Sequence, residues 1–174
     1  MIKRFALALA LCAAALPGIA ADARVPLPGG GSLVLPVPAG WKQSRQSSEI
    51  PTIALTPEAG NAFVVLVTPL VRPDGVMAPA DAESLRSLVS SSAQHAASQA
   101  AEKSLPVQDL RGGNAQGHYF SATDRAPKPG EFKYLTQGAV AIQGLPVSFT
   151  ILSNGDPQQA TDPAFRMLKA ARRE

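Results

Sequence analysis

The residues that could carry chemistry in this sequence are few and lie far apart. Its only histidines are His95 and His118, which fall on different predicted elements. Protein metal sites usually hold their ligands at close and regular spacing, such as a helical histidine pair about four residues apart. Neither HxxxH nor HxH occurs in this chain. We therefore predict no metal ligands and no bound cofactor.

Nucleophilic catalysis finds equally little support. The serines Ser90–Ser92 shortly precede His95, but a serine nucleophile also needs an orienting carboxylate and an oxyanion hole. Adjacent helical serines point in different directions, and no GxSxG elbow is present. The glycine-rich segments GGGS and RGGN match neither phosphate-binding glycine pattern. We expect no catalytic residues, and hence a protein that is not an enzyme.

Four residues stay as candidate surface or binding contacts: Trp41, His118, Tyr119 and Tyr134. The segment GHYF places His118 beside Tyr119, and Asp124 follows a few residues later. The alternative to a non-enzymatic protein is thus a small-ligand-binding protein or a hydrolase that uses His118 with Tyr119 or Asp124. Convergence of His118 and a carboxylate in a deep pocket would favour that alternative.

Trp41, the only tryptophan, lies in the segment LPVPAGWKQ. Pro38 fixes its own backbone φ angle, and Gly40 permits a tight turn just before the tryptophan. Large apolar side chains are more often buried than displayed. We therefore expect Trp41 to anchor the fold by covering one end of an aliphatic core, in preference to contacting a ligand.

The first 23 residues have the pattern of a secretory signal peptide. Lys3 and Arg4 precede an apolar run over residues 5–16, and small residues follow it. The run is short for a membrane span, so we expect no stable membrane insertion after cleavage. Cleavage is expected after Ala20, Ala21 or Ala23, which predicts a periplasmic or secreted protein. The single cysteine, Cys12, would leave with this segment.

The charge balance argues against one class of partner. The formal net charge is +3, and no Lys/Arg run is interleaved with aromatic residues. We therefore expect no nucleic-acid binding. The densest basic pair, Arg172–Arg173, is expected at the C-terminal end of a helix, where the negative end of the helix dipole favours cations.

Hydrophobic patterns predict mostly strands. After a flexible lead-in over residues 24–31, a single domain is expected over 32–174. Strands are predicted over 32–37, 41–46, 52–57 and 61–71, with a turn between the first two. Pro36 indicates an edge strand, because proline donates no ladder hydrogen bond. The run over 61–71 is nearly all apolar, which favours the interior of a sheet.

One long helix and a terminal helix complete the pattern. Asp81 is a predicted N-cap of a helix that ends near Lys103, with an apolar stripe that includes Leu85, Leu88, Val89, Ser92, Ala96 and Ala100. A hairpin is predicted over 107–124, strands over 132–143 and 145–153, and a helix over 161–173 with Pro163 in its first turn. Segregated strands and helices define an α+β fold, an antiparallel sheet with flanking helices.

The element order and the segment with Pro38, Gly40 and Trp41 resemble the Mog1/PsbP-like superfamily, most closely the small bacterial periplasmic DcrB-type proteins. The terminal helix over 161–173 fits the same pattern. The resemblance implies an α/β/α sandwich and carries no shared catalytic residues. With the export signal, it implies a non-enzymatic binding or adaptor domain that supports an envelope complex or an envelope stress response, with an envelope protein as partner.

Overall fold

The computed structural model describes residues 19–46, 51–60 and 62–174. Their strands form two antiparallel sheets. In the larger sheet the order is β3 (Trp41–Gln46), β4 (Thr52–Pro57), β5 (Phe63–Pro69), β9 (Leu145–Ser153), β8 (Tyr134–Ile142), β7 (Ala115–Thr123) and β6 (Gln108–Gly112). The smaller sheet has β2 (Ser32–Pro38) between β1 (Ile19–Pro26) and β10 (Arg172–Arg173).

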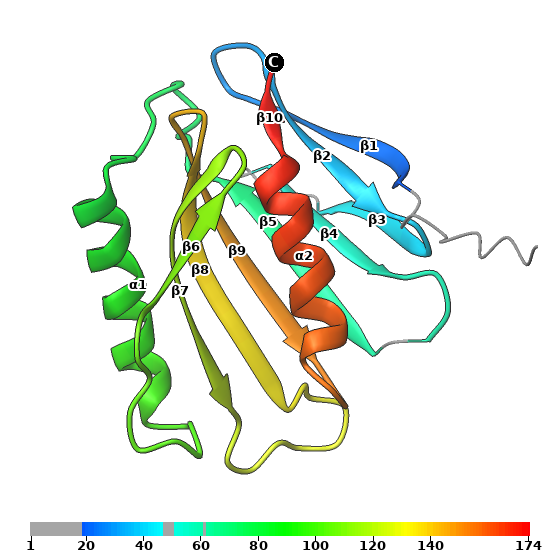
Figure 1. Cartoon of the computed structure of the whole chain (residues 1–174), viewed down its shortest axis with the longest axis vertical. Helices are drawn as coiled ribbons and strands as arrows, with labels where there is room; N and C mark the ends of the chain where they lie inside the picture. The colour runs from blue at the N-terminus through cyan, green and yellow to red at the C-terminus, as the bar shows by residue number, and fades with distance from the viewer. Residues whose placement is uncertain (1–18, 47–50, 61) are drawn as a thin grey trace, which may run out of the picture.

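The two helices lie on opposite faces of the larger sheet. Helix α1 (Ala82–Ala97) packs against β7 and β8, while α2 (Gln158–Ala170) contacts β2 of the smaller sheet as well as β9 of the larger one. Figure 1 shows α1 along one side of the sheet and α2 in front of it, beside β1 and β2. The α+β fold with an antiparallel sheet and flanking helices is confirmed.

The core divides into two clusters because successive strand residues point to opposite faces. On the α2 side, Val147, Phe149 and Ile151 of β9 pack in one cluster with Met167 and Leu168 of α2. On the other side, α1 buries its own row of apolar residues against the sheet. That second cluster is made of Leu85, Val89, Ala93, Ala100, Phe120, Ala122 and Ala139.

Most predicted elements occur close to their expected positions. Strand β5 lies between β4 and β9, so its expected interior place is confirmed. The hairpin of β6 and β7 and the tight turn at Gly144 between β8 and β9 also occur. Asp81 caps α1, since its carboxylate accepts a hydrogen bond of 2.9 Å from the backbone N–H of Ser84.

Both helices differ from the prediction in their bounds. Helix α1 ends at Ala97 and not near Lys103, because the following residues bond to β7 instead: the N–H of Ala101 donates to the carbonyl of Thr123. Helix α2 begins at Gln158, where Asp156 accepts the first backbone N–H. Pro163 therefore lies inside α2 and not in its first turn.

The expected pairing of residues 32–37 with 41–46 is wrong. Strand β3 pairs with β4, and β2 belongs to the smaller sheet. Strand β2 is also central rather than an edge strand. Pro36 is tolerated there because β10 reaches only Leu33 and Val34, so at Pro36 the ladder continues on one side alone.

The chain termini of the described part also differ from expectation. Residues 24–31 are not a flexible lead-in, because Arg24–Pro26 belong to β1 and pair with β2. Arg172–Arg173 form strand β10 beyond the end of α2.

The signal peptide predicted over residues 1–23 stays a prediction, and residues 1–18 lie outside the described part. Within the described ranges, no helix is long and apolar enough to cross a membrane.

Candidate functional site

His118 lies on β7 under α1 and is only 4% exposed. Helix α1 covers the face of the sheet on which His118 lies. Its Nδ1 lies 2.9 Å from Oδ1 of Asp109, the residue directly opposite on β6. This contact has the length of an ion pair without the direction of a hydrogen bond, so Nδ1 has no hydrogen-bond partner among the described residues.

Asp109 also forms ion pairs with two arginines. Its carboxylate lies 3.1 Å from Arg111 on the same strand and 3.9 Å from Arg86 on α1. The cluster therefore joins β6, β7 and α1 through one half-exposed carboxylate. His118 does not line any of the three hollows described below.

The hydrolase alternative required other partners for His118, and the structure does not bring them together. Tyr119 follows His118 on the same strand and so points to the opposite face. Asp124 is six residues farther along, a separation of about 20 Å in a strand. In the part of the chain that the structure describes, no group of three or more His, Cys, Asp or Glu residues could hold a metal ion.

The aromatic candidates mainly support the fold. Trp41 is half-buried, packs against the core and lies 4.7 Å from the ring of Phe63, as expected for an anchor. The ring of Tyr119 lies 4.9 Å from that of Phe165, and its hydroxyl donates to Gln108. Tyr134, at the start of β8, is half-buried and has the ammonium of Lys133 5.3 Å from its ring centre.

A groove between α1 and the sheet offers a better candidate site. Its first hollow, of about 230 Å³, is lined by Leu70, Leu88, Val89, Phe120 and Ala139 with the uncharged polar residues Ser92, Gln137 and Ser148. Its second hollow, of about 170 Å³, is lined by Ala96, Ala100, Leu135, Leu152, Phe132, Asp124 and Lys133. We call the two together the α1 groove.

The hollows lie in line along the helix. Ser92 and Ala96 are one helical turn apart, Gln137 and Leu135 are successive residues on one face of β8, and Ser148 and Leu152 share one face of β9. The α1 groove therefore runs beside α1 over β8 and β9.

The groove exists because of which helical row enters the core. Leu85, Val89 and Ala93 are the buried residues of α1, whereas Leu88 is 44% exposed. The row Leu88, Ser92 and Ala96, expected to be buried, instead forms the groove wall. Its serine and alanine are too short to fill the space beside the sheet. The short side chains of this row are visible in the sequence, but the sequence alone could not show which row of the helix faced the core.

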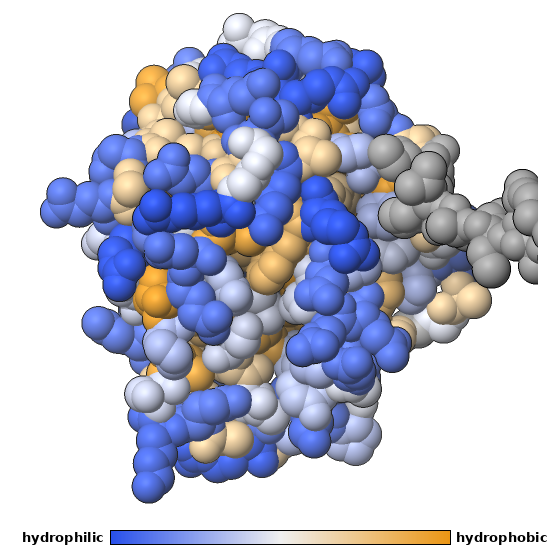
Figure 2. Space-filling view, viewed as in Figure 1, coloured by the Kyte–Doolittle hydropathy of each residue, from blue (hydrophilic) through white to orange (hydrophobic). Residues whose placement is uncertain are grey.

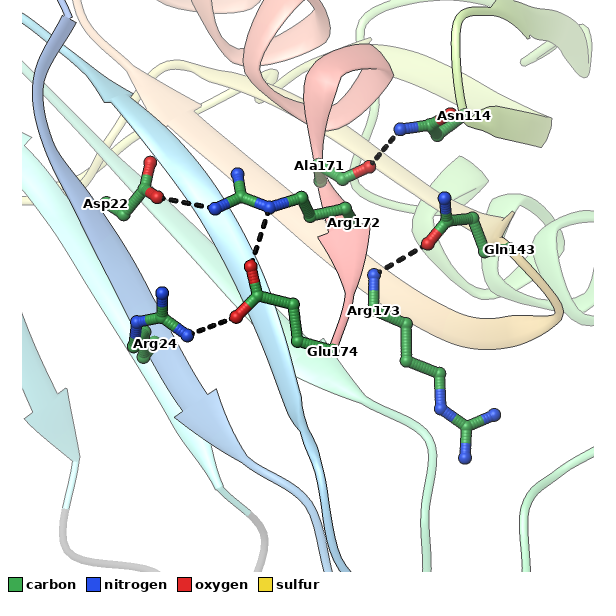
Figure 3. A network of polar contacts seen from close by, with 8 residues as sticks. All are labelled: Asp22, Arg24, Asn114, Gln143, Ala171, Arg172, Arg173 and Glu174. Carbon is green, nitrogen blue, oxygen red and sulfur yellow. Dashed lines mark hydrogen bonds and ion pairs between the residues drawn. The ribbon is translucent and has the colours of Figure 1, made fainter.

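A third hollow, of about 450 Å³, lies at the tips of two hairpins and is lined by residues that include Arg111, Gly113, Asn114, Gln143 and Gly144. Its amides serve the fold: Asn114 donates to the carbonyl of Ala171, and Gln143 accepts the N–H of Arg173 (Figure 3). Both amides thereby fix the chain between α2 and β10.

Figure 3 also shows a charged network that ties β10 to β1. The guanidinium of Arg172 donates to Asp22 and Glu174 at 2.7 and 2.8 Å, and Arg24 donates to Glu174 as well. The bonds from Arg24 and Arg172 lower the pKa of Glu174, and the carboxylates of Asp22 and Glu174 raise the pKa of Arg172. The network is exposed and ties strands of the smaller sheet together, and none of its four charged residues lines the three hollows described here.

The face of the molecule that carries α2 is mainly hydrophilic, with apolar residues visible chiefly between polar ones (Figure 2).

No family model matches this chain, and no curated protein matches it at a significant level. The α1 groove is consequently the feature on which a functional assignment can be based.

Proposed function

We propose that this protein is a non-enzymatic binding domain and that the α1 groove is its binding site. The carrying observation is the lining of the first hollow, where apolar side chains surround Ser92, Gln137 and Ser148. Small-ligand sites typically combine an apolar lining with a few uncharged polar groups that orient the ligand. The buried His118, by contrast, is not among the lining residues of the three hollows described above.

The proposal includes a Mog1/PsbP-like sandwich. It is supported by the antiparallel sheet with one helix on each face. It is further supported by the turn at Gly40, where φ is +78°, which leads directly into Trp41 and strand β3. Because fold alone does not determine function, the sandwich supports a binding role without naming the ligand.

We further propose that the domain acts after export, as an adaptor in the bacterial envelope. The support is the basic start, the apolar run and the small residues of the first 23 positions. The partner would be an envelope component that occupies the α1 groove.

The test is capture of envelope components from a bacterial periplasmic and membrane extract, with and without a blocked groove. Ser92→Phe places a large ring in the first hollow, whereas Ser87→Phe, on an exposed position of the same helix, is the matched control. We expect Ser92→Phe to lose at least nine-tenths of a component that the native chain and Ser87→Phe retain equally. Equal retention by all three chains would disprove a binding role of the groove.

A further inference from the structure

Charged residues line only one end of the α1 groove, and their position limits the kind of ligand that the groove can bind. The first hollow has no charged lining residue. The second contains Lys133 and Asp124. A ligand that extends through both hollows would therefore meet uncharged surroundings over most of its length and charges at one end only.

The two charged groups are not equivalent. The carboxylate of Asp124 already accepts the backbone N–H of Ala126. The ammonium of Lys133 is exposed and lies near the ring of Tyr134, and no ion pair involves it in the described part of the chain. The cation is thus the more available partner at this end of the groove.

The uncharged part excludes an ionised group. Burying a charge without a partner costs several kcal/mol, and the first hollow offers only the hydroxyls of Ser92 and Ser148 and the amide of Gln137 as polar side chains. Leu88, Val89 and Phe120 in contrast present aliphatic and aromatic surface. The matching ligand segment is a slender apolar chain.

The dimensions suit a chain of moderate length. From Leu88 to Ala96 the helix wall extends about 12 Å, and Ser148 to Leu152 on β9 extends about 14 Å. The two hollows together reach the lower part of the usual size range of small-ligand sites, about 300–1,000 Å³. A folded or branched multi-chain lipid exceeds that space.

We infer that the α1 groove binds a single-chain amphiphile, with its acyl chain along Leu88, Phe120 and Leu152 and its anionic head at Lys133. This rests on the proposed function, because it names the occupant of the same groove. Charge complementarity at Lys133 and the uncharged first hollow determine the orientation of the ligand: chain toward Leu70, head toward the loop between β7 and β8.

The experiment is calorimetric titration of the folded chain with dodecanoate, and with dodecanol as the uncharged analogue, both below their aggregation concentrations. Saturable one-to-one binding of dodecanoate is expected. Lys133→Gln should weaken dodecanoate about three- to fivefold, the size of an exposed ion pair, and leave dodecanol unchanged. Lys128→Gln, an exposed lysine in the same loop outside both hollows, should change neither.

Two groove variants test whether loss of binding comes from the groove itself and not from misfolding of the chain. Ser92→Phe and Leu88→Glu should each abolish binding of both compounds, and Leu88→Glu alters a side chain that is already 44% exposed. Absence of saturable binding to the native chain, or equal effects of Lys133→Gln and Lys128→Gln, would overturn the inference. If amphiphile binding fails while Ser92→Phe still loses an envelope component, the inference falls and the binding role of the groove stands.

Discussion

Trp41 lies half-buried on the edge strand β3, where its ring packs 4.7 Å from that of Phe63. Its neighbour across the strand pair is Pro57 on β4. A tryptophan in this position closes one end of the core cluster between the larger sheet and α2. Its partial exposure makes it a weaker contributor than a fully buried tryptophan.

We predict that Trp41→Ala lowers the free energy of unfolding by about 2 kcal/mol, from lost apolar burial and one aromatic pair. This is less than the roughly 3–5 kcal/mol expected for a fully buried ring. Urea unfolding followed by far-ultraviolet circular dichroism measures the change. Unaltered stability would show that Trp41 does not anchor the core.

Glu174 makes stability depend on pH. Because Arg24 and Arg172 lower its pKa in the folded state, its contribution is fully present above its ordinary pKa of 4.5 and is lost as pH falls through the lower folded value. Glu102 acts in the same sense: burial alone would raise its pKa, but hydrogen bonds from Thr123 outweigh this effect and lower it. Both residues predict weakening in acid.

We predict that Glu174→Gln melts at a lower temperature than the native chain at neutral pH, with the difference shrinking as pH falls below about 4.5 and vanishing below the folded pKa. Differential scanning calorimetry across that pH series measures it. Glu58→Gln, at an exposed carboxylate outside this network, should leave the melting temperature nearly unchanged. A difference that is constant with pH would contradict the assignment.

Among the elements, β1 (Ile19–Pro26) is the one in which the predicted signal-peptide cleavage sites lie. Ala23 in β1 is fully buried, and Asp22 holds Arg172 of β10. A predicted cleavage after Ala23 would remove both residues, whereas cleavage after Ala20 or Ala21 would keep them. The packing of the smaller sheet therefore favours the earlier two of the three positions.

We predict that a chain beginning at Arg24 is less stable than one beginning at Ala21 by about 2–3 kcal/mol, through lost methyl burial and lost strand hydrogen bonds. Guanidinium unfolding of the two chains measures the difference. The mass of the exported protein should then correspond to a start at Ala21 or Asp22. A start at Arg24 with full stability would refute this view of β1.

At the scale of the whole molecule, the arrangement of layers produces the α1 groove. Helix α2 contacts strands of both sheets, whereas the main contacts of α1 are with β7 and β8. The neighbouring strands β9 and β5 thus keep half-buried residues on the α1 side, among them Leu66, Thr150 and Leu152. The groove follows from one helix covering only part of a seven-stranded sheet.

Local patterns in the sequence determined the antiparallel α+β class, the hairpins and the cap at Asp81, because strand alternation, turn glycines and N-caps act over a few residues. Contacts between distant segments decided the rest. Arg172–Arg173 became a strand only because β2 offers a partner, and Asp109 met His118 only through the register of β6 and β7. The row Leu88, Ser92 and Ala96 became a groove wall because Leu85, Val89 and Ala93 entered the core, a choice fixed by how α1 packs on the sheet.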